Sequence, residues 1–189
     1  MSKITISQVK EALPKIEAGL QKYLCLRDQI HDVNVSKEVK KFQKPYKGFF
    51  RMRRNEDFCK VYFGFMEKHK NDKRLTFEAV LKHLHRNTER VEASFASKLL
   101  SMINPDMPVL DRHVLKVLGI PAVGTFGDAQ KRIGRGIAAY KAICELYNHH
   151  FKSGEAKKWI ELFDKHYPDA KSKITGVKKI DLILWKMGN

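Results

Sequence analysis

The chain has few cysteines, no leader segment and no long apolar run, and each shortage excludes a class of protein. Its three cysteines, Cys25, Cys59 and Cys144, are odd in number and far apart, which argues against a disulfide framework. The N-terminus carries no hydrophobic leader. No stretch approaches the roughly 20 apolar residues needed to cross a bilayer. We therefore expect a reduced, cytoplasmic protein with no membrane partner.

Signatures for cofactors and metal ions are also missing. Residues 134–136, Gly-Arg-Gly, lie inside a predicted helix and follow no strand, so they do not form a phosphate-binding glycine loop. The pairs His83/His85 and His149/His150 have spacings that keep the two rings off one helical face. No cysteine or acid cluster completes a ligand set. We predict neither a metal ion nor a cofactor.

Acidic residues are scarce relative to basic ones. The chain has 37 Lys plus Arg against 21 Asp plus Glu, a formal net charge of +16. An excess of this size points to an anionic partner, and nucleic acid is the most common one. The alternative is a cationic surface that serves only solubility.

The apolar residues recur every three or four positions along most of the chain, and no segment alternates persistently with period two. This pattern predicts helices near residues 7–26, 55–69, 76–87, 88–103, 111–119, 128–151, 155–167 and 175–187, and Pro14 must kink the first or place its start later. Asn55, Thr76 and Thr88 are predicted N-caps, and Asp128 or Gly127 opens the longest helix. At 189 residues the prediction is an all-α, single-domain protein, an orthogonal array of about eight helices.

Three residues within these helices are unusual for their positions. Gly134 and Gly136 weaken the longest helix, which predicts close packing against a neighbour. Asp181 lies in the largely apolar last helix, where a carboxylate needs compensation. We predict that a nearby basic residue pairs with it.

A basic segment between residues 37 and 54 also carries aromatic rings. It has eight Lys or Arg side chains against the single acid Glu38, and Pro45 and Gly48 are expected to make it irregular. Such a segment could lie along a phosphate backbone while its rings stack, or it could be a solvated loop that its rings hold against the core. Contacts with nucleic acid are predicted for Lys44, Lys47, Arg51, Arg53 and Arg54.

The most informative stretch is residues 95–119. Its first part continues an amphipathic helix, which Pro105 and Pro108 must end. Asp111 then opens a second helix as its N-cap, and Gly119 ends that helix in the left-handed conformation. This arrangement places a carboxylate at a helix N-terminus after a proline-containing turn.

The segment Pro108-Val109-Leu110-Asp111-Arg112-His113-Val114 resembles the P-V-D-x-H-V element of the helix-hairpin-helix DNA glycosylases. Together with Ser97-Lys98 it is similar to their oxoguanine-glycosylase-like branch, although residues 90–94 replace the glycine-rich hairpin. The resemblance implies a protein that binds duplex DNA and removes an oxidised base after flipping it out of the helix. It implies that Asp111 stabilises charge at the sugar or activates the attacking group. It also implies that Lys98 forms a Schiff base.

Plainer interpretations of the same residues stay open. Asp111 can be only an N-cap, and Lys98 a surface lysine whose stem lies along the core. The whole chain can be a non-catalytic nucleic-acid-binding helical module, or a helical protein-interaction domain. In its second half, contacts with nucleic acid are predicted for Arg112, His113, Lys131, Arg132 and Arg135.

Overall fold

The computed structural model describes residues 4–189, and every regular element in that range is a helix. The α-helices are α1 (Ile6–Ala12), α2 (Glu17–Gln29), α3 (Lys44–Phe49), α4 (Glu56–His69), α5 (Phe77–Thr88), α6 (Ala93–Ile103), α7 (Arg112–Leu118), α8 (Ala129–Lys152), α9 (Glu155–His166) and α10 (Gly176–Gly188). Two 3₁₀ turns, η1 (Leu13–Lys15) and η3 (Pro168–Ala170), and a π-helical turn, η2 (Val39–Gln43), complete the set. The all-helical prediction is confirmed, and the orthogonal packing stays a prediction.

Ten α-helices replace the predicted eight for two local reasons. Pro14 lies in η1 and divides the first predicted helix into α1 and α2, because proline cannot donate the backbone hydrogen bond of a helix interior. The second addition is α3, which forms in the segment predicted to be irregular. None of the helices within residues 4–189 is long and apolar enough to cross a membrane.

The basic segment is therefore helical over residues 39–49, which corrects the prediction of irregular structure. Pro45 occupies the first turn of α3, where a backbone N–H has no helical partner in any case. Phe42 and Tyr46 are fully buried, and the Tyr46 hydroxyl lies 2.7 Å from that of Tyr62. The rings thus belong to the core, whereas residues 51–55 contain no helix.

Most helices begin directly after the predicted caps, because an N-cap side chain bonds only to backbone N–H groups in the first turn of its own helix. The side chain of each predicted cap accepts a hydrogen bond from the first turn at Asn55, Thr76, Asp111 and Asp128. Thr88 is the exception. It is the last residue of α5, and its hydroxyl donates to the Leu84 carbonyl. Glu89 closes α5 in a left-handed conformation, so α6 begins only at Ala93.

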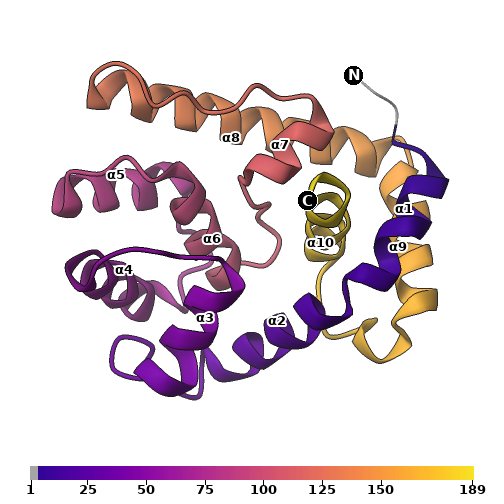
Figure 1. Ribbon diagram of the computed structural model, residues 1–189, viewed down its shortest axis with the longest axis horizontal. Helices are drawn as coiled ribbons and strands as arrows, with labels where there is room; N and C mark the ends of the chain where they lie inside the picture. The colour runs from indigo at the N-terminus through magenta and orange to yellow at the C-terminus, as the bar shows by residue number, and fades with distance from the viewer. Residues whose placement is uncertain (1–3) are drawn as a thin grey trace.

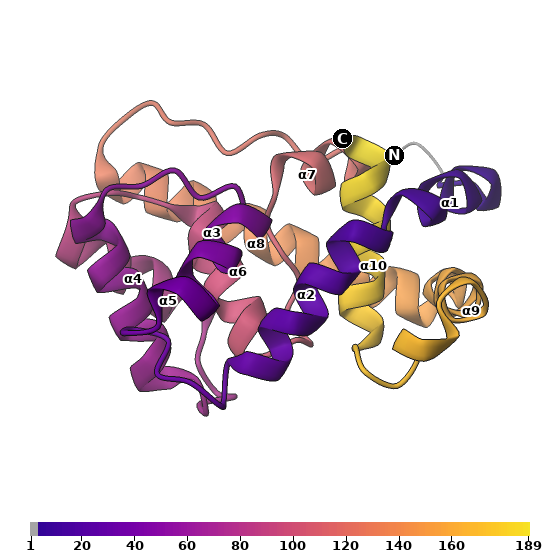
Figure 2. The same ribbon diagram turned by 60° about the horizontal axis from the view of Figure 1, so that its bottom comes forward.

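Helix α10 lies in the right-hand part of Figures 1 and 2, among α1, α7 and α9. It packs against α7, α9 and α1. On the other side of the fold, α4, α5 and α6 pack in sequence, and α8 extends across α5, α6 and α7 towards α9 (Figure 1). A methyl group on Gly136 would lie 3.2 Å from the Ala93 side chain and 3.3 Å from Leu81, whereas Gly134 has open space. The predicted close packing is found at Gly136 alone.

The end of α10 touches α7 through its backbone. The His113 ring nitrogen Nδ1 lies 2.7 Å from the Gly188 carbonyl oxygen. A Cβ atom on Gly188 would lie only 2.3 Å from the His113 carbonyl oxygen. The glycine is therefore required for the last turn of α10 to approach α7 this closely.

Gly188→Ala is expected to lower the free energy of unfolding by about 1–3 kcal/mol, the usual cost of overpacking. The collision is with backbone, which cannot rotate away as a side chain can. Gly134→Ala is the matched control, since nothing lies within 4 Å and alanine favours a helix by about 1 kcal/mol. Urea unfolding of both variants measures the difference. Equal midpoints for Gly188→Ala and the wild type would contradict the expectation.

Candidate functional site

A cavity of about 960 Å³ lies where α2, α6, α7 and α10 meet. Its remaining wall comes from the end of α3 and the segment that follows it, from the residues directly before α6 and α7, from residues 122–125 and from Arg132 of α8. The site is therefore assembled from segments spread over most of the sequence.

Lys98 and Asp111 lie together in the wall of this cavity. The Lys98 ammonium nitrogen is 3.0 Å from Asp111 Oδ2, and both residues are largely buried. Asp111 Oδ1 accepts a hydrogen bond of 3.0 Å from the backbone N–H of His113. The Lys98 ammonium also lies 5.3 Å from the ring centroid of Phe95 and 5.9 Å from that of Phe50. The two residues predicted as catalytic thus form one ion pair with aromatic neighbours.

The protonation state of Asp111 follows from these contacts. Burial raises the pKa of its carboxyl group, but the Lys98 ammonium and the His113 N–H stabilise the ionised form more strongly. The net effect lowers the pKa below its usual value. At neutral pH the group is a carboxylate, able to accept protons and hydrogen bonds or to stabilise positive charge.

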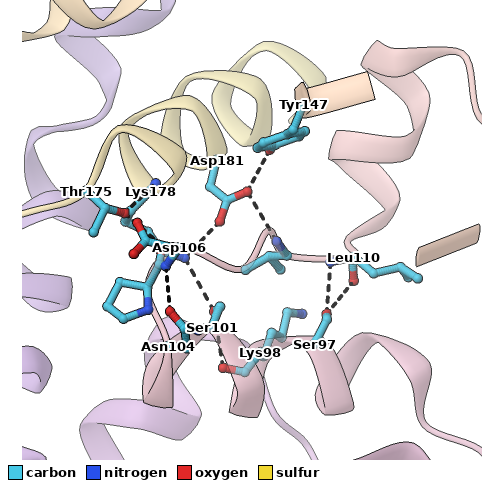
Figure 3. Close-up of polar contacts among 12 residues, drawn as sticks. Ser97, Lys98, Ser101, Asn104, Asp106, Leu110, Tyr147, Thr175, Lys178 and Asp181 are labelled. Atoms are coloured by element: carbon cyan, nitrogen blue, oxygen red, sulfur yellow. Dashed lines mark hydrogen bonds and ion pairs between the residues drawn. The ribbon is translucent and has the colours of Figure 1, made fainter. Parts of the chain in front are cut away.

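The turn that carries Asp111 is held by side chains from two helices, as Figure 3 shows. Ser97 of α6 accepts a hydrogen bond of 2.9 Å from the Leu110 N–H through its hydroxyl oxygen. Asp181 of α10 accepts one of 3.2 Å from the Val109 N–H. Because both bonds fix residues directly before Asp111, they determine where its carboxylate points.

Asp181 is itself the centre of a buried polar network (Figure 3). Its Oδ1 also accepts a hydrogen bond of 2.6 Å from the Tyr147 hydroxyl, and the Lys178 ammonium donates to its Oδ2 at 2.9 Å. Burial and the Asp181 charge raise the pKa of Tyr147 well above its usual value, so the hydroxyl stays a donor. The prediction that a nearby basic residue compensates Asp181 is confirmed.

The cavity wall carries an excess of positive charge. Nine Lys or Arg side chains and three acids line it. Arg54 and Glu92, 2.8 Å apart, form the third ion pair besides Lys98–Asp111 and Lys178–Asp181. Within residues 4–189, the other six cations have no carboxylate within ion-pairing distance. These six are Lys22, Arg51, Arg53, Arg112, Arg132 and Lys186.

Protein-family models, curated proteins and solved structures give no match to this chain. The interpretation of the site therefore rests on its own residues.

Arg51 and Trp185 form one side of the cavity. Arg51 has φ 52°, a left-handed conformation that costs a non-glycine residue roughly 1–2 kcal/mol. Its guanidinium carbon lies 5.4 Å from the Trp185 ring centroid, within the range of a cation–π interaction. The His113 ring lies edge-on to the same indole, with the ring centroids 5.9 Å apart. Trp185 thus has a cation and an imidazole as neighbours in the cavity wall.

Not all predicted nucleic-acid contacts reach the cavity. Six of the ten predicted residues line it: Arg51, Arg53, Arg54, Arg112, His113 and Arg132. Lys44, Lys47, Lys131 and Arg135 do not. Lys131 instead lies 3.5 Å from Asp128, one turn back on the same helix, and Arg135 binds carbonyl groups of the loop before α8.

The sequence prediction missed Lys22, Lys178, Lys186 and Trp185, all of which line the cavity. Each is a single side chain on a helix, with no motif around it, and its role depends on helix packing. Over residues 4–189, no three His, Cys, Asp or Glu side chains gather closely enough to bind a metal ion.

Proposed function

We propose that this protein binds DNA, receives an extruded nucleotide in the cavity and cleaves the bond between base and sugar with the help of Asp111. The observation that carries the proposal is the Lys98–Asp111 pair, whose ammonium and carboxylate are 3.0 Å apart in the wall of a cavity of about 960 Å³. Six further cations line this cavity without an ion pair to any of residues 4–189.

Binding follows from charge and ring surfaces. Phosphate groups neutralise cations that have no acidic partner inside the protein, and they release condensed counterions as they do so. Arg51 and Arg53 come from the segment after α3, while Arg112 and Arg132 come from α7 and α8, so the cavity wall carries cations from separate parts of the chain. Trp185, a half-buried aromatic residue in the cavity wall, is the ring against which a base can stack.

Cleavage would use the carboxylate in its charged form. As the bond between C1′ and the base nitrogen breaks, its electron pair leaves with the base, which takes up a proton. Water then adds its oxygen to C1′ and gives up a proton. A carboxylate with a lowered pKa stays ionised and stabilises the positive charge on the sugar, while the proton from water passes to solvent.

Lys98 offers a second route at the same site. Its ammonium group, which lies 3.0 Å from Asp111 Oδ2, must first release a proton to solvent, because a carboxylate with a lowered pKa is too weak a base to accept it. The amine nitrogen can then bond to C1′ while the base leaves with its electron pair. When the C1′–O4′ bond opens, O4′ takes a proton and an imine with Lys98 remains.

A non-catalytic DNA-binding module is the second candidate, and one observation favours it. Both oxygens of Asp111 already have partners, His113 N–H on Oδ1 and the Lys98 ammonium on Oδ2. The pair can therefore be a bridge between α6 and α7 that only shapes the cavity. The same cations would hold DNA without altering it.

Incubation with duplexes that carry single oxidised bases tests the proposal. Wild-type protein is expected to release the base, and Asp111→Asn to lower the rate by on the order of a hundredfold. Asparagine is as good an N-cap as aspartate, so the variant removes charge and keeps the helix start. Asp128→Asn is the matched control, because Asp128 also caps a helix and pairs with a lysine but lies outside the cavity.

Salt-dependent binding with every duplex left intact would reject cleavage and support the non-catalytic module. No binding at low salt would reject both. Borohydride, which reduces an imine to a stable amine, separates the two cleavage routes. A covalent adduct lost in Lys98→Gln but kept in Lys22→Gln would assign the lysine route, whereas cleavage without an adduct would assign the water route.

A further inference from the structure

The loop between α7 and α8 presents an aromatic ring to solvent. Phe126 is 73% exposed, the most exposed of the large hydrophobic residues among positions 4–189. Burying such a ring is worth several times the thermal energy, so leaving it in water is costly unless it has a partner. Gly124 and Thr125, directly before it, line the cavity. The loop that carries the ring therefore forms part of the cavity wall, although the ring itself does not line the cavity.

Two residues fix the ring in this position. A Cβ on Gly124 would lie 2.5 Å from the Phe126 ring, so a larger residue there would make the ring move from this position. Arg135 of α8 lies with its guanidinium carbon 4.2 Å from the ring centroid. The same guanidinium donates hydrogen bonds to the carbonyl oxygens of Gly124 and Phe126. The exposed ring is thus held in place by the loop and by α8.

The surroundings of the ring indicate which partner it fits. Arg132 lines the adjacent cavity wall without an acidic partner, and Arg135 lies against the ring itself. An apolar protein surface would have to bury these charges, whereas a nucleic acid offers phosphates to the cations and flat bases to the ring. In a perfect duplex the base faces are already stacked on each other. An open base face exists only where the duplex is interrupted.

We propose that Phe126 stacks on a base at an interruption in the DNA duplex, so that the protein binds such sites in preference to perfect duplex. The inference rests on the proposed function, since it needs DNA at the cavity. Arg135 positions the ring, and the unpaired nucleotide next to it enters the cavity. The preference is then a property of the loop and is separate from cleavage.

The test compares two fluorescent hairpin DNAs of equal length, one fully paired and one with a single bulged nucleotide, at a fixed salt concentration. Wild-type protein is expected to bind the bulged hairpin about tenfold more tightly, the usual worth of one stacked base. Phe126→Ala is expected to lose this preference while its affinity for the paired hairpin stays unchanged. Gly124→Ala, which displaces the ring without removing it, is expected to reduce the preference. Phe151→Ala, another exposed phenylalanine outside the cavity, should keep it.

The outcomes separate the two ideas. Binding of both hairpins without a preference, or a preference that survives Phe126→Ala, overturns the stacking role and leaves the proposed function standing. An equal loss of affinity for both hairpins in Phe126→Ala also overturns the stacking role, because the ring would then contact DNA without stacking on an unpaired base. If wild-type protein binds neither hairpin at low salt, the proposed function fails and this inference fails with it.

Discussion

Asp181→Ala is expected to lower the free energy of unfolding by about 3–5 kcal/mol, the largest effect of any single substitution considered for this protein. The carboxylate is buried and has three donors, the Lys178 ammonium, the Tyr147 hydroxyl and the Val109 N–H. Alanine leaves all three without an acceptor. One of these donors is the charged Lys178 ammonium, which would keep a hydrogen bond of 3.4 Å to the Ser101 hydroxyl.

Most of this loss of stability comes from the three donors that are left buried without an acceptor, and less of it from the hydrogen bonds themselves. A buried cation without its counterion retains its full desolvation cost, and an unpaired N–H or O–H adds about 1–3 kcal/mol. Asp181→Asn keeps a carbonyl oxygen for one donor, so its free energy of unfolding should lie between those of Asp181→Ala and the wild type. Asp57→Ala is the control, since its side chain is 87% exposed and its pairing with Lys60 is worth little.

Chemical denaturation monitored by the fluorescence of Trp159 and Trp185 measures these differences. A change below about 1 kcal/mol for Asp181→Ala would show that water replaces the carboxylate at little cost. In that case the network would not fix the turn before Asp111. The double variant Asp181→Leu with Lys178→Met should recover part of the loss, because it removes the unpaired charge.

Removal of four cavity cations should have the largest effect on DNA binding. The variant replaces Arg51, Arg53, Arg112 and Arg132 by glutamine. We expect affinity for duplex DNA at low salt to fall by on the order of a hundredfold or more, because each arginine that contacts a phosphate releases about one counterion. The slope of log affinity against log salt should flatten by about 3–4.

The fold should tolerate these four changes, since none of the arginines forms an ion pair in the described structure and three are exposed. The control changes Lys10, Lys157, Lys158 and Lys165 to glutamine. These lysines lie on α1 and α9 outside the cavity, and replacing them removes the same amount of positive charge as replacing the four arginines. Fluorescence anisotropy over a range of salt concentrations gives both slopes. Identical slopes for the two variants would mean that DNA is attracted by net charge alone and does not bind at the cavity.

The Asp181 and arginine experiments probe different parts of one arrangement. Asp181 and Ser97 hold the backbone from which the Asp111 carboxylate projects, and the arginines determine what approaches it. A loss of stability with unchanged DNA affinity is expected at Asp181→Asn, and the reverse in the arginine variant. The two sets of measurements therefore test structure and binding independently.

The helices could be predicted because their causes are local. Apolar residues at a spacing of three and four, caps such as Asn55 and Thr76, and the break at Pro14 act within a few residues of chain. The predictions failed where the local signals were ambiguous. Thr88 can cap a helix or end one, and Pro45 can break a helix or begin one.

The candidate site was only partly predictable for the same reason. The position of Asp111 at a helix start predicted an N-cap, and the resemblance of the surrounding stretch singled out both Asp111 and Lys98 as catalytic candidates. Their contact at 3.0 Å crosses a turn whose course depends on Ser97 and Asp181, one from α6 and one from α10. No spacing in the sequence encodes such a contact.

By itself, the sequence determined an all-helical chain with a strong positive charge and an aspartate at the mouth of a short helix. These properties depend on composition and on interactions between residues close in the chain. Tertiary structure alone decided which charges are neutralised, as in Arg54–Glu92, and which face the cavity unpaired. It also decided that Trp185 lines the cavity and Phe126 is exposed beside it. The physical reason is that ion pairing, burial and exposure depend on distances between helices, and packing of the whole chain sets those distances.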